Sequence, residues 1–311
     1  MESCRTWYGK ALLELARRDP TIVALDADLS KSTMSTYIEQ EFPERFIEVG
    51  IAEQDMIGIA AGLALTGLRP FANSFAVFIT GRAYDQVRQA IAYPNLNVKL
   101  VGSSAGLSDF GDGATHQSIE DISLMRGLPN MTVIVPADHI QTRAATLYLG
   151  THTGPAYLRI SRTETEAIFP DDYVFRLGKV DRLVRGSDVA IVASGTITAT
   201  ALDASRRLAS IGISASVVCV STLKPLDTED LIDALEETRN VITLEEHSVY
   251  GGLGSIVAEL LGSSGGYRVH MMGVKDRFGQ SAESFTDLLD CYGLTADDVV
   301  EAACQMIGKQ P

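Results

Sequence analysis

Apolar residues recur along this chain with two spacings in alternation, and this alternation constrains the fold more than any other feature. Short runs rich in β-branched residues, such as residues 21–25 and 98–101, predict strands. The stretches between such runs, for example residues 53–65 and 82–92, predict helices. Strands that alternate with helices build a mostly parallel sheet covered by helices on both faces. The expected fold class is therefore α/β.

The predicted elements form two successive groups. Strands of the first group are expected at residues 21–25, 46–49, 71–75, 98–101, 131–135 and 156–160. Strands of the second group are expected at residues 188–193, 215–220, 240–244 and 267–271. Between residues 161 and 186 the periodicity fades and polar residues dominate. We therefore expect two α/β domains, at residues 1–165 and 187–311, joined by a linker at residues 166–186, in keeping with about 150 residues per domain.

The charge of the chain argues against several classes of protein. The 26 Lys and Arg residues oppose 40 Asp and Glu residues, and the net charge of −14 is the wrong sign for binding nucleic-acid phosphates. No stretch approaches the roughly 18 apolar residues of a membrane span, and the first residues lack a signal-peptide pattern. The widely spaced cysteines indicate free thiols. We expect a cytoplasmic protein that binds neither nucleic acid nor a membrane.

The first candidate functional residue is Glu53, which follows a predicted strand and begins an apolar helix. Residues just past the ends of parallel strands line the crevice where ligands bind. The apolar neighbours Ile51 and Met56 would raise the pKa of this carboxyl group by desolvation. Alternatively, Glu53 only stabilises the positive end of the helix dipole.

Two further stretches carry candidate residues. Phe75 and Phe78 lie at the end of the next predicted strand, where a pair of aromatic residues can also be plain core. A glycine-rich loop at residues 106–121 brings Asp112 and His116 close together ahead of a helix. Polar loop residues on an α/β scaffold often carry function, so this loop is a candidate site.

Together these stretches resemble the pyrimidine-binding domain of the transketolase family of thiamine diphosphate enzymes. The motifs are GIAEQDM at residues 50–56, the phenylalanine pair, RAYDQV at residues 82–87 and GDGATHQSIED at residues 111–121. The second predicted domain resembles the transketolase C-terminal domain more loosely, through SGTITATAL at residues 194–202 and TLEEHSVYGGLGS at residues 243–255. Nearly the whole chain is thus similar to the C-terminal half of a full-length transketolase.

The resemblance implies a set of cofactor and catalytic residues. Glu53 matches the glutamate that hydrogen-bonds the pyrimidine N1′ of thiamine diphosphate, where a partly desolvated carboxyl group can share a proton with that nitrogen. Phe78 matches the aromatic residue that stacks on the pyrimidine, with Phe75 beside it, and Arg82 belongs to the same cofactor-binding set. His116 matches the histidine that meets the substrate oxygens and moves a proton there.

The resemblance also implies substrate-binding residues. Asp112 matches the aspartate that binds a sugar hydroxyl, and Asp28 lies at a family position near the substrate. Arg5, Ser32 and Arg162 match the anchor for a sugar phosphate, for which guanidinium groups are well suited. Where many family members have a histidine, this chain has Ser103-Ser104, which implies a different anionic group or an unphosphorylated acceptor.

The family motif that holds Mg²⁺ and the diphosphate is a Gly-Asp-Gly followed by a distant Asn, and it is missing here. Asn130 lies too near the Gly-Asp-Gly at residues 111–113, which instead continues into the substrate loop. We therefore predict no metal ligand in this chain, because a hard cation needs a set of oxygen ligands. The resemblance implies an N-terminal partner subunit that carries the diphosphate domain and most of the Mg²⁺ site, in a complex expected to be a heterotetramer.

The leading hypothesis is thus a subunit of a split transketolase that moves a two-carbon ketol unit from a ketose phosphate to an aldose-type acceptor. The alternatives are the β subunit of a 2-oxo-acid dehydrogenase, a carboligase similar to deoxyxylulose-phosphate synthase, and a non-catalytic scaffold or regulatory subunit. Two features of the second domain stay open. The glycines at residues 251–254 indicate a tight turn rather than a phosphate loop, and His247 lies either near the substrate entrance or on the surface.

Overall fold

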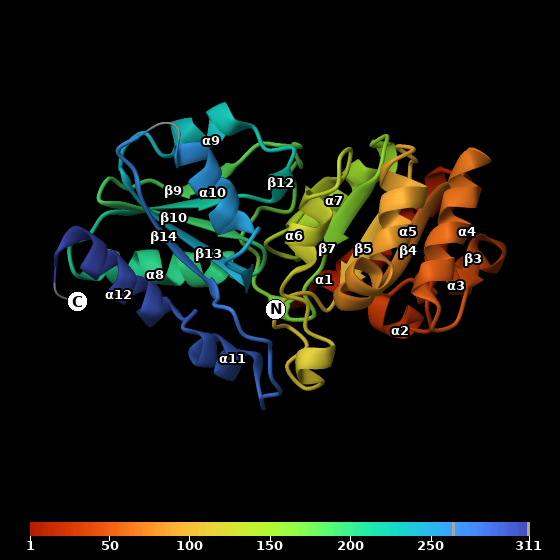
Figure 1. Ribbon diagram of the computed structural model, residues 1–311, viewed down its shortest axis with the longest axis horizontal. Coiled ribbons are helices and arrows are strands. Elements are labelled where there is room, and N and C mark those ends of the chain that lie inside the picture. The colour runs from red at the N-terminus through yellow and green to blue at the C-terminus, as the bar shows by residue number, and fades with distance from the viewer. Residues whose placement is uncertain (263–264, 310–311) are drawn as a thin grey trace.

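The computed structural model describes residues 1–262 and 265–309 and contains two sheets that are mostly parallel (Figure 1). The first sheet has the order β12-β6-β7-β5-β4-β2-β3 and the second has the order β14-β13-β10-β11-β9. Strands β12 and β9 are the antiparallel members, each at one edge of its sheet. Helices cover these sheets, as the alternating sequence pattern predicts, and the expected α/β class is confirmed.

The bounds of the strands are as follows. The seven-stranded sheet contains β2 (Ile22–Asp26), β3 (Phe46–Glu48), β4 (Arg69–Phe75), β5 (Lys99–Ser103), β6 (Thr132–Ile134), β7 (Ala156–Arg159) and β12 (Thr222–Lys224). The five-stranded sheet contains β9 (Asp181–Val184), β10 (Val189–Ser194), β11 (Ala215–Cys219), β13 (Asn240–Ser248) and β14 (Arg268–Val274). A two-stranded antiparallel ribbon joins β1 (Glu2–Ser3) to β8 (Glu164–Thr165).

The helices lie between these strands. The α-helices are α1 (Cys4–Arg18), α2 (Ser30–Thr33), α3 (Thr36–Glu41), α4 (Glu53–Leu65), α5 (Tyr84–Gln86), α6 (Asp121–Arg126), α7 (His139–Thr151), α8 (Thr198–Ser210), α9 (Thr228–Ala234), α10 (Leu253–Gly262), α11 (Phe285–Tyr292) and α12 (Ala296–Ile307). Two π-helical segments, Phe78–Arg82 and Val87–Ala92, flank α5, and 3₁₀ turns occur at Pro43–Arg45 and Gly113–Thr115.

Alternation along the buried strands divides the first domain's core between two faces. In β2, Ile22 and Ala24 pack in the cluster that contains α1 and α7, whereas Val23 and Leu25 pack in the cluster that contains α4. Successive residues of a strand point to opposite faces, so a sheet covered on both faces needs apolar residues at every position. The buried apolar run at residues 22–25 of β2 meets that requirement.

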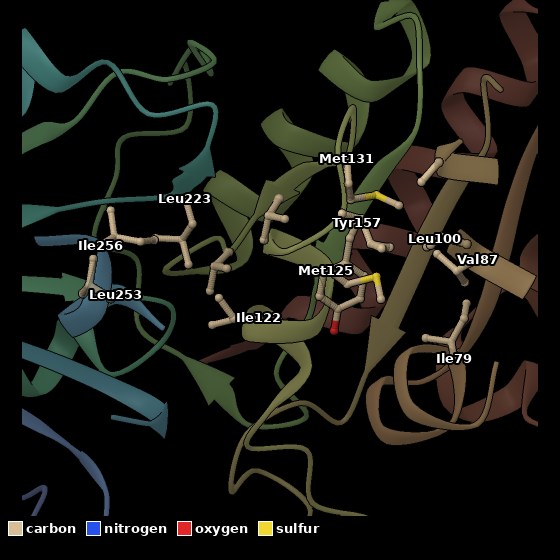
Figure 2. Packing of buried hydrophobic residues seen from close by; sticks show 14 of the residues in the cluster. Ile79, Val87, Leu100, Ile122, Met125, Met131, Tyr157, Leu223, Leu253 and Ile256 are labelled. Atoms are coloured by element: carbon tan, nitrogen blue, oxygen red, sulfur yellow. The ribbon is translucent and has the colours of Figure 1, made fainter. Parts of the chain in front are cut away.

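One apolar cluster runs from the first sheet to the second. Figure 2 shows part of it, where Ile122 of α6 lies on the side of the first domain and Leu253 and Ile256 of α10 lie on the side of the second. Leu223 of β12 belongs to the same cluster. The strand β12 follows β11 in the chain but pairs with β6, so the second half of the chain completes the first sheet.

Several elements differ from the sequence-based expectation. The short strands β1, β8, β9 and β12 were not predicted, and β9 lies within the segment expected to be a linker. The helix expected at residues 82–92 is mainly π-helical. Within residues 1–262 and 265–309, no helix is long and apolar enough to cross a membrane.

Candidate active site

The candidate residues gather past the carboxyl ends of neighbouring strands in the first sheet. Glu53 begins α4 after β3, and Phe75 is the last residue of β4. Asp112 and His116 lie in the loop that follows β5. Because these strands are parallel, their carboxyl ends meet at one edge of the sheet, the place where open α/β sheets bind ligands.

Glu53 is the most buried acidic residue of this group, with 1% of its surface exposed. Its two carboxylate oxygens accept hydrogen bonds from Nη1 of Arg82, at 3.0 Å and 2.8 Å. The Arg82 side chain is 45% exposed, so the ion pair has one buried and one accessible member. A buried carboxylate needs such a partner, because desolvation otherwise favours its neutral form.

A group of three rings begins beside this ion pair. The guanidinium carbon of Arg82 lies 4.4 Å from the centroid of the Phe78 ring. Phe78 stacks nearly parallel to Phe75, with centroids 6.1 Å apart and an interplanar angle of 13°. His116 meets both rings edge to face, at 5.4 Å from Phe78 and 6.1 Å from Phe75. The structure thus brings together five residues that the sequence motifs nominated.

The π-helical segment Phe78–Arg82 explains how Phe78 and Arg82 reach this place. A π-helix takes more residues per turn than an α-helix and often marks a functional position. Its two ends are Phe78 and Arg82, so both side chains contact one another, and Arg82 reaches Glu53 from there. The sequence pattern predicts a helix only from Arg82 onward and gives no sign of the wider turn before it.

A second group of contacts forms around Arg162. Its guanidinium Nη1 donates to Oδ1 of Asp109 at 2.8 Å and lies 3.6 Å from Oδ2 of Asp112. The backbone N–H of Arg162 donates to the Ser108 hydroxyl at 3.0 Å. Asp109 is almost fully buried, and burial together with the nearby Asp112 raises the pKa of its carboxyl group, although Arg162 acts in the opposite direction.

Asp109 is a residue that the sequence analysis missed. It lies in the same glycine-rich loop as Asp112, so the loop itself was found but the buried partner of Arg162 was not. One of its carboxylate oxygens, Oδ2, is buried without a hydrogen-bond partner among the described residues. Only its burial and its contact with Arg162 mark Asp109 as part of the site.

Arg5 and Ser32 contact each other beside this group. Nη1 of Arg5 donates to the backbone oxygen of Ser32 at 2.8 Å. Burial and the neighbouring positive charge of Arg162 lower the pKa of the Arg5 guanidinium. Its Nε is buried and has no partner among the described residues. Two guanidinium groups thus lie near one another here, and the carboxylates of Asp109 and Asp112 partly offset their charge.

Asp28 is held by a different residue. Its backbone N–H donates to Oε1 of Glu48 at 2.8 Å, and the same oxygen accepts from the N–H of Gly50 at 2.8 Å. Asp28 has a φ of 62°, a left-handed conformation that Asp adopts more readily than most residues. Its exposed side chain follows β2 at the same edge of the sheet, but the contacts of the structure do not join it to Arg5 or Glu53.

Ser103 and Ser104 occupy the positions where the family resemblance led us to expect a histidine. Both are fully buried, and neither hydroxyl has a hydrogen-bond partner among residues 1–262 and 265–309. Ser104 has a φ of 55°. The two serines therefore do not present their hydroxyl groups on the surface beside Asp112 and His116.

The second domain contributes buried residues to the boundary between the two domains. His247 is fully buried, which excludes the surface position considered from the sequence. Its Nε2 accepts from the backbone N–H of Ser123 at 3.4 Å, and its Nδ1 donates to the Ser248 oxygen at 2.7 Å. The Glu245 carboxylate accepts from the N–H groups of Leu253 and Gly254, at 2.7 Å and 2.8 Å. The N-terminus of α10 thus binds a carboxylate of this chain, which supports the tight-turn interpretation of the glycines.

The residues around Glu53 fit the pyrimidine end of thiamine diphosphate. The half-exposed Phe78 offers an aromatic face, and the buried Glu53 carboxylate lies beside it next to an accessible guanidinium. A flat heteroaromatic ring with a hydrogen-bonding nitrogen requires such a combination. For the Mg²⁺ and diphosphate end, no cluster of three or more His, Cys, Asp or Glu residues suited to a metal occurs in the part of the chain that is described.

Comparison with known families agrees with this geometry. Residues 2–167 match the family described as "Transketolase, pyrimidine binding domain". Residues 178–299 match the family described as "Transketolase, C-terminal domain". Together these matches cover most of the chain.

Individual relatives match over nearly their whole length. The chain is 45% identical to the "6-deoxy-6-sulfo-D-fructose transketolase subunit SqwH" of Clostridium sp. (strain MSTE9), over 98% of this chain and 95% of the relative. It is 39% identical to a subunit of the apulose-4-phosphate transketolase of Phocaeicola vulgatus, over 99% of both chains. Among solved structures, "Split gene transketolase, inactive beta4 tetramer" superposes with a TM-score of 0.91 at 46% identity and covers all of both chains.

Proposed function

The chain belongs to the transketolase family, and from this premise we propose that it is one subunit of a split, thiamine diphosphate-dependent transketolase. The complex would transfer a two-carbon ketol unit from a ketose phosphate to an aldose-type acceptor. The observation that carries the proposal is the joint placement of Glu53, Phe78 and His116 at one edge of the sheet, with Arg82 linking the first two.

Glu53 and Arg82 would serve the cofactor. When bound, thiamine diphosphate supplies a nucleophilic carbon and accepts the electron pair of the broken carbon–carbon bond. The buried Glu53 side chain would hydrogen-bond the pyrimidine nitrogen and hold a proton there. Phe78, supported by Phe75, would pack against the pyrimidine ring.

His116 would act on the substrate. Its ring edge faces Phe75 and Phe78, and its Nδ1 lies 2.9 Å from the Thr115 hydroxyl. The Thr115 hydroxyl would orient Nδ1, and Nε2 would meet the substrate. An imidazole in this position can accept the proton of a substrate hydroxyl as the carbon–carbon bond breaks, and can return it to the acceptor. Asp112, half-exposed on the same loop, would accept a hydrogen bond from a sugar hydroxyl.

The terminal anionic group of the donor would bind between Arg5 and Arg162. Support comes from the unpaired Nε of Arg5 and from the mutual repulsion of the two guanidinium groups, which an anion relieves. Ser32 lies beside Arg5 and completes the proposed anchor, and Asp28 follows β2 nearby as a contact for the sugar. Because one relative is named for a sulfo sugar and another for a sugar phosphate, both sulfonate and phosphate donors should be tested.

The diphosphate and Mg²⁺ would be held mainly by a second polypeptide. The names of the relatives as subunits support an N-terminal partner subunit, and we propose a heterotetramer of two copies of each chain. Within this chain, residues 1–165 would form the pyrimidine-binding domain and residues 187–311 the C-terminal domain, with residues 166–186 between them. We assign the complex to the cytoplasm, since free cysteines, three of them buried, suit a reducing compartment.

The experiment that tests this function reconstitutes the complex. The chain is mixed with a candidate partner that contains Gly-Asp-Gly and the downstream Asn, in the presence of thiamine diphosphate and Mg²⁺. Ketose donors with a terminal phosphate or sulfonate are then screened against aldehyde acceptors. Transfer by the mixture but not by either chain alone is expected, and full activity of this chain alone would contradict the split enzyme.

The same assay separates the alternatives. Decarboxylation of a 2-oxo acid with transfer to a lipoyl acceptor would identify a 2-oxo-acid dehydrogenase subunit, and condensation of pyruvate with an aldose phosphate would identify a carboligase. In each of these cases Glu53 would still be needed. Activity that survives undiminished without Glu53 would support a non-catalytic role for this chain.

The first variant for this assay is Glu53→Gln. Gln keeps the size of the side chain but neither ionises nor carries the shared proton, so we expect ketol transfer to fall by about 10²- to 10⁴-fold. The thermal unfolding temperature, measured alongside, shows whether the loss of the Arg82 ion pair has also disturbed the fold. The assignment of Glu53 is wrong if transfer stays at the wild-type rate in a folded complex.

A further inference from the structure

We propose that a segment of the second domain, residues 276–284, positions the loop that carries Asp112 and His116. We refer to this segment, which connects β14 to α11, as the arm, and to residues 109–117 as the substrate loop. This inference rests on the proposed function, since it names further residues on which the same site depends. The arm descends from β14 toward the 3₁₀ turn at Gly113–Thr115 (Figure 1).

Hydrogen bonds join the arm to both ends of the substrate loop. The side-chain Nε2 of Gln117 donates to the backbone oxygen of Gln280 at 2.9 Å and to that of Asp109 at 3.2 Å. One amide group thus links the arm, the end of the loop and its beginning. The backbone N–H of Ala282 donates to the Phe110 oxygen at 2.9 Å, which adds a second bond from the arm near the beginning of the loop.

Packing between arm and loop leaves no room for side chains at two glycines. A Cβ added at Gly279 would overlap the side-chain amide of Gln117, with the Gln117 Cδ only 2.8 Å away. A Cβ added at Gly113 would overlap the hydroxyl of Ser281 and lie 3.0 Å from the Ser281 nitrogen. Gly113 also has a φ of +75°, a conformation that favours glycine. The arm of the second domain and the substrate loop of the first therefore pack so closely that neither glycine has room for a side chain.

The arm itself is anchored on α11. The Tyr292 hydroxyl donates to the backbone oxygen of Phe278 at 2.8 Å. The Arg277 guanidinium lies over the Tyr292 ring at 4.1 Å and donates to the Cys291 oxygen at 2.5 Å. Because its base is fixed in this way, the arm can restrain the loop rather than move with it.

Restraint of this loop matters because of what it carries. A glycine-rich loop gains much conformational freedom when it is released, and Asp112, His116 and the partner of Arg162 all lie in it. A misplacement of about 1 Å can lower the rate of a positioned reaction by about 10²-fold. The arm thus lets the second domain influence the chemistry of the first. Gly279 of the arm and Gln117 of the substrate loop act as positioning residues.

The experiment uses Gly279→Ala in the reconstituted complex. We expect kcat/KM for ketol transfer to fall by about 10- to 100-fold, with the affinity for thiamine diphosphate unchanged, because among the described residues no hydrogen bond, ion pair or ring contact joins Glu53 or Phe78 to the arm. Hydrogen exchange of the amides in residues 109–117 should accelerate by about tenfold as the loop is released. Gly262→Ala is the matched control, since a Cβ there meets nothing within 4 Å and α10 favours alanine.

A second variant protects the test against misfolding. Gln117→Ala removes the bridging amide without adding volume, and we expect it to change kinetics and exchange in the same direction as Gly279→Ala. If both act through the same contact, the double variant should be little worse than Gln117→Ala alone, which a double-mutant cycle measures.

Two results would overturn the proposal. One is unchanged exchange in residues 109–117 in both single variants, and the other is faster exchange with no change in kcat/KM. Hydrogen exchange of residues 109–117 can be measured whether or not the complex is active. A complex that transfers no ketol unit would therefore refute the proposed function, and the exchange rates would still test the contact between the arm and the substrate loop.

Discussion

At the scale of single residues, the site depends on charges placed where water is scarce. Glu53 is buried and paired with Arg82, and Asp109 is buried and paired with Arg162. Arg5 lies near Arg162 and has an unpaired donor. The chain has a net charge of −14, so its overall field repels an anionic substrate, and these few cations must act at short range.

The proposed anion-binding role of Arg5 leads to a prediction about substrate selectivity. Arg5→Gln should lower kcat/KM by about 10- to 100-fold for a donor with a terminal phosphate or sulfonate, the usual contribution of a hydrogen bond between charged groups. A ketose without an anionic end should react at nearly the wild-type rate. Steady-state kinetics with both donors provide the measurement.

The control for this prediction lies on the same helix. Arg17 of α1 pairs with Glu41 on the surface, so Arg17→Gln should leave both donors unaffected. An equal loss for charged and uncharged donors in Arg5→Gln would show that Arg5 supports the fold or the sugar rather than the anion.

At the scale of elements, the end of β13 and the start of α10 place buried titratable groups between the domains. The Glu245 carboxylate accepts two N–H groups at the start of α10, yet burial raises its pKa to about 7. Burial lowers the pKa of His247 to about 4, and its hydrogen bonds, one donated and one accepted, are those of a neutral imidazole.

These shifts have opposite effects on stability. The folded state holds His247 neutral, so lowering the pH from 6.5 toward 4 favours the unfolded chain, in which the imidazole is protonated. Glu245 acts in the other direction, because its raised pKa makes the fold lose stability as the pH rises from 4.5 toward 7. The wild-type protein alone would show only the sum of the two effects.

A comparison with His247→Gln isolates the contribution of the histidine. The free energy of unfolding of the wild type minus that of the variant should decrease by up to about 3 kcal/mol as the pH falls from 6.5 to 4. Above pH 6.5 the difference should be constant. Urea unfolding of both proteins across this range gives the values. A difference that does not vary between pH 4 and 6.5 would contradict the assignment of a neutral His247.

At the scale of the whole molecule, a buried ion pair connects the two domains. Arg159 of β7 donates to Asp121 at 2.7 Å within the first domain, and its Nη2 donates to the backbone oxygen of Glu246 in β13 at 2.9 Å. Tyr157 adds a hydrogen bond to the same Asp121 carboxylate at 2.6 Å. Burial raises the pKa of Asp121, but Arg159 and the other groups around the carboxylate together outweigh burial, so the pKa is lowered. This network lies beside the continuous apolar cluster of Figure 2 and favours a fixed arrangement of the domains.

Removal of the cation should therefore be costly. Arg159→Leu leaves the Asp121 carboxylate buried without its charge partner, so we expect a loss of about 3–5 kcal/mol in the free energy of unfolding. Denaturant titration measures it, and Arg207→Leu, which breaks an exposed pair on α8, should leave the unfolding midpoint near the wild-type value. A loss as small as that of the exposed pair would show that the buried pair contributes little.

Much of the fold could be predicted from local patterns. The strands β2, β4, β5, β10 and β13 are apolar runs between helical segments. Such runs can be recognised from the local sequence, without knowing which strands lie beside them. The edge strands β9 and β12 were missed because each is short and pairs antiparallel with a strand far away in the chain. Such an element is stabilised by its partner rather than by its own sequence.

The sequence by itself determined the α/β class and the family and nominated Glu53, Phe78 and His116 as candidate site residues, because these inferences depend on periodicity and on short motifs. The tertiary structure alone placed Arg82 against Glu53, buried Asp109 and His247, and brought the arm onto the substrate loop. Gln117 and Gln280 are 163 residues apart in the chain, and no local pattern indicates that they meet. Burial, charge pairing and backbone approach are properties of the packed molecule, since each depends on which distant residues exclude water from a group.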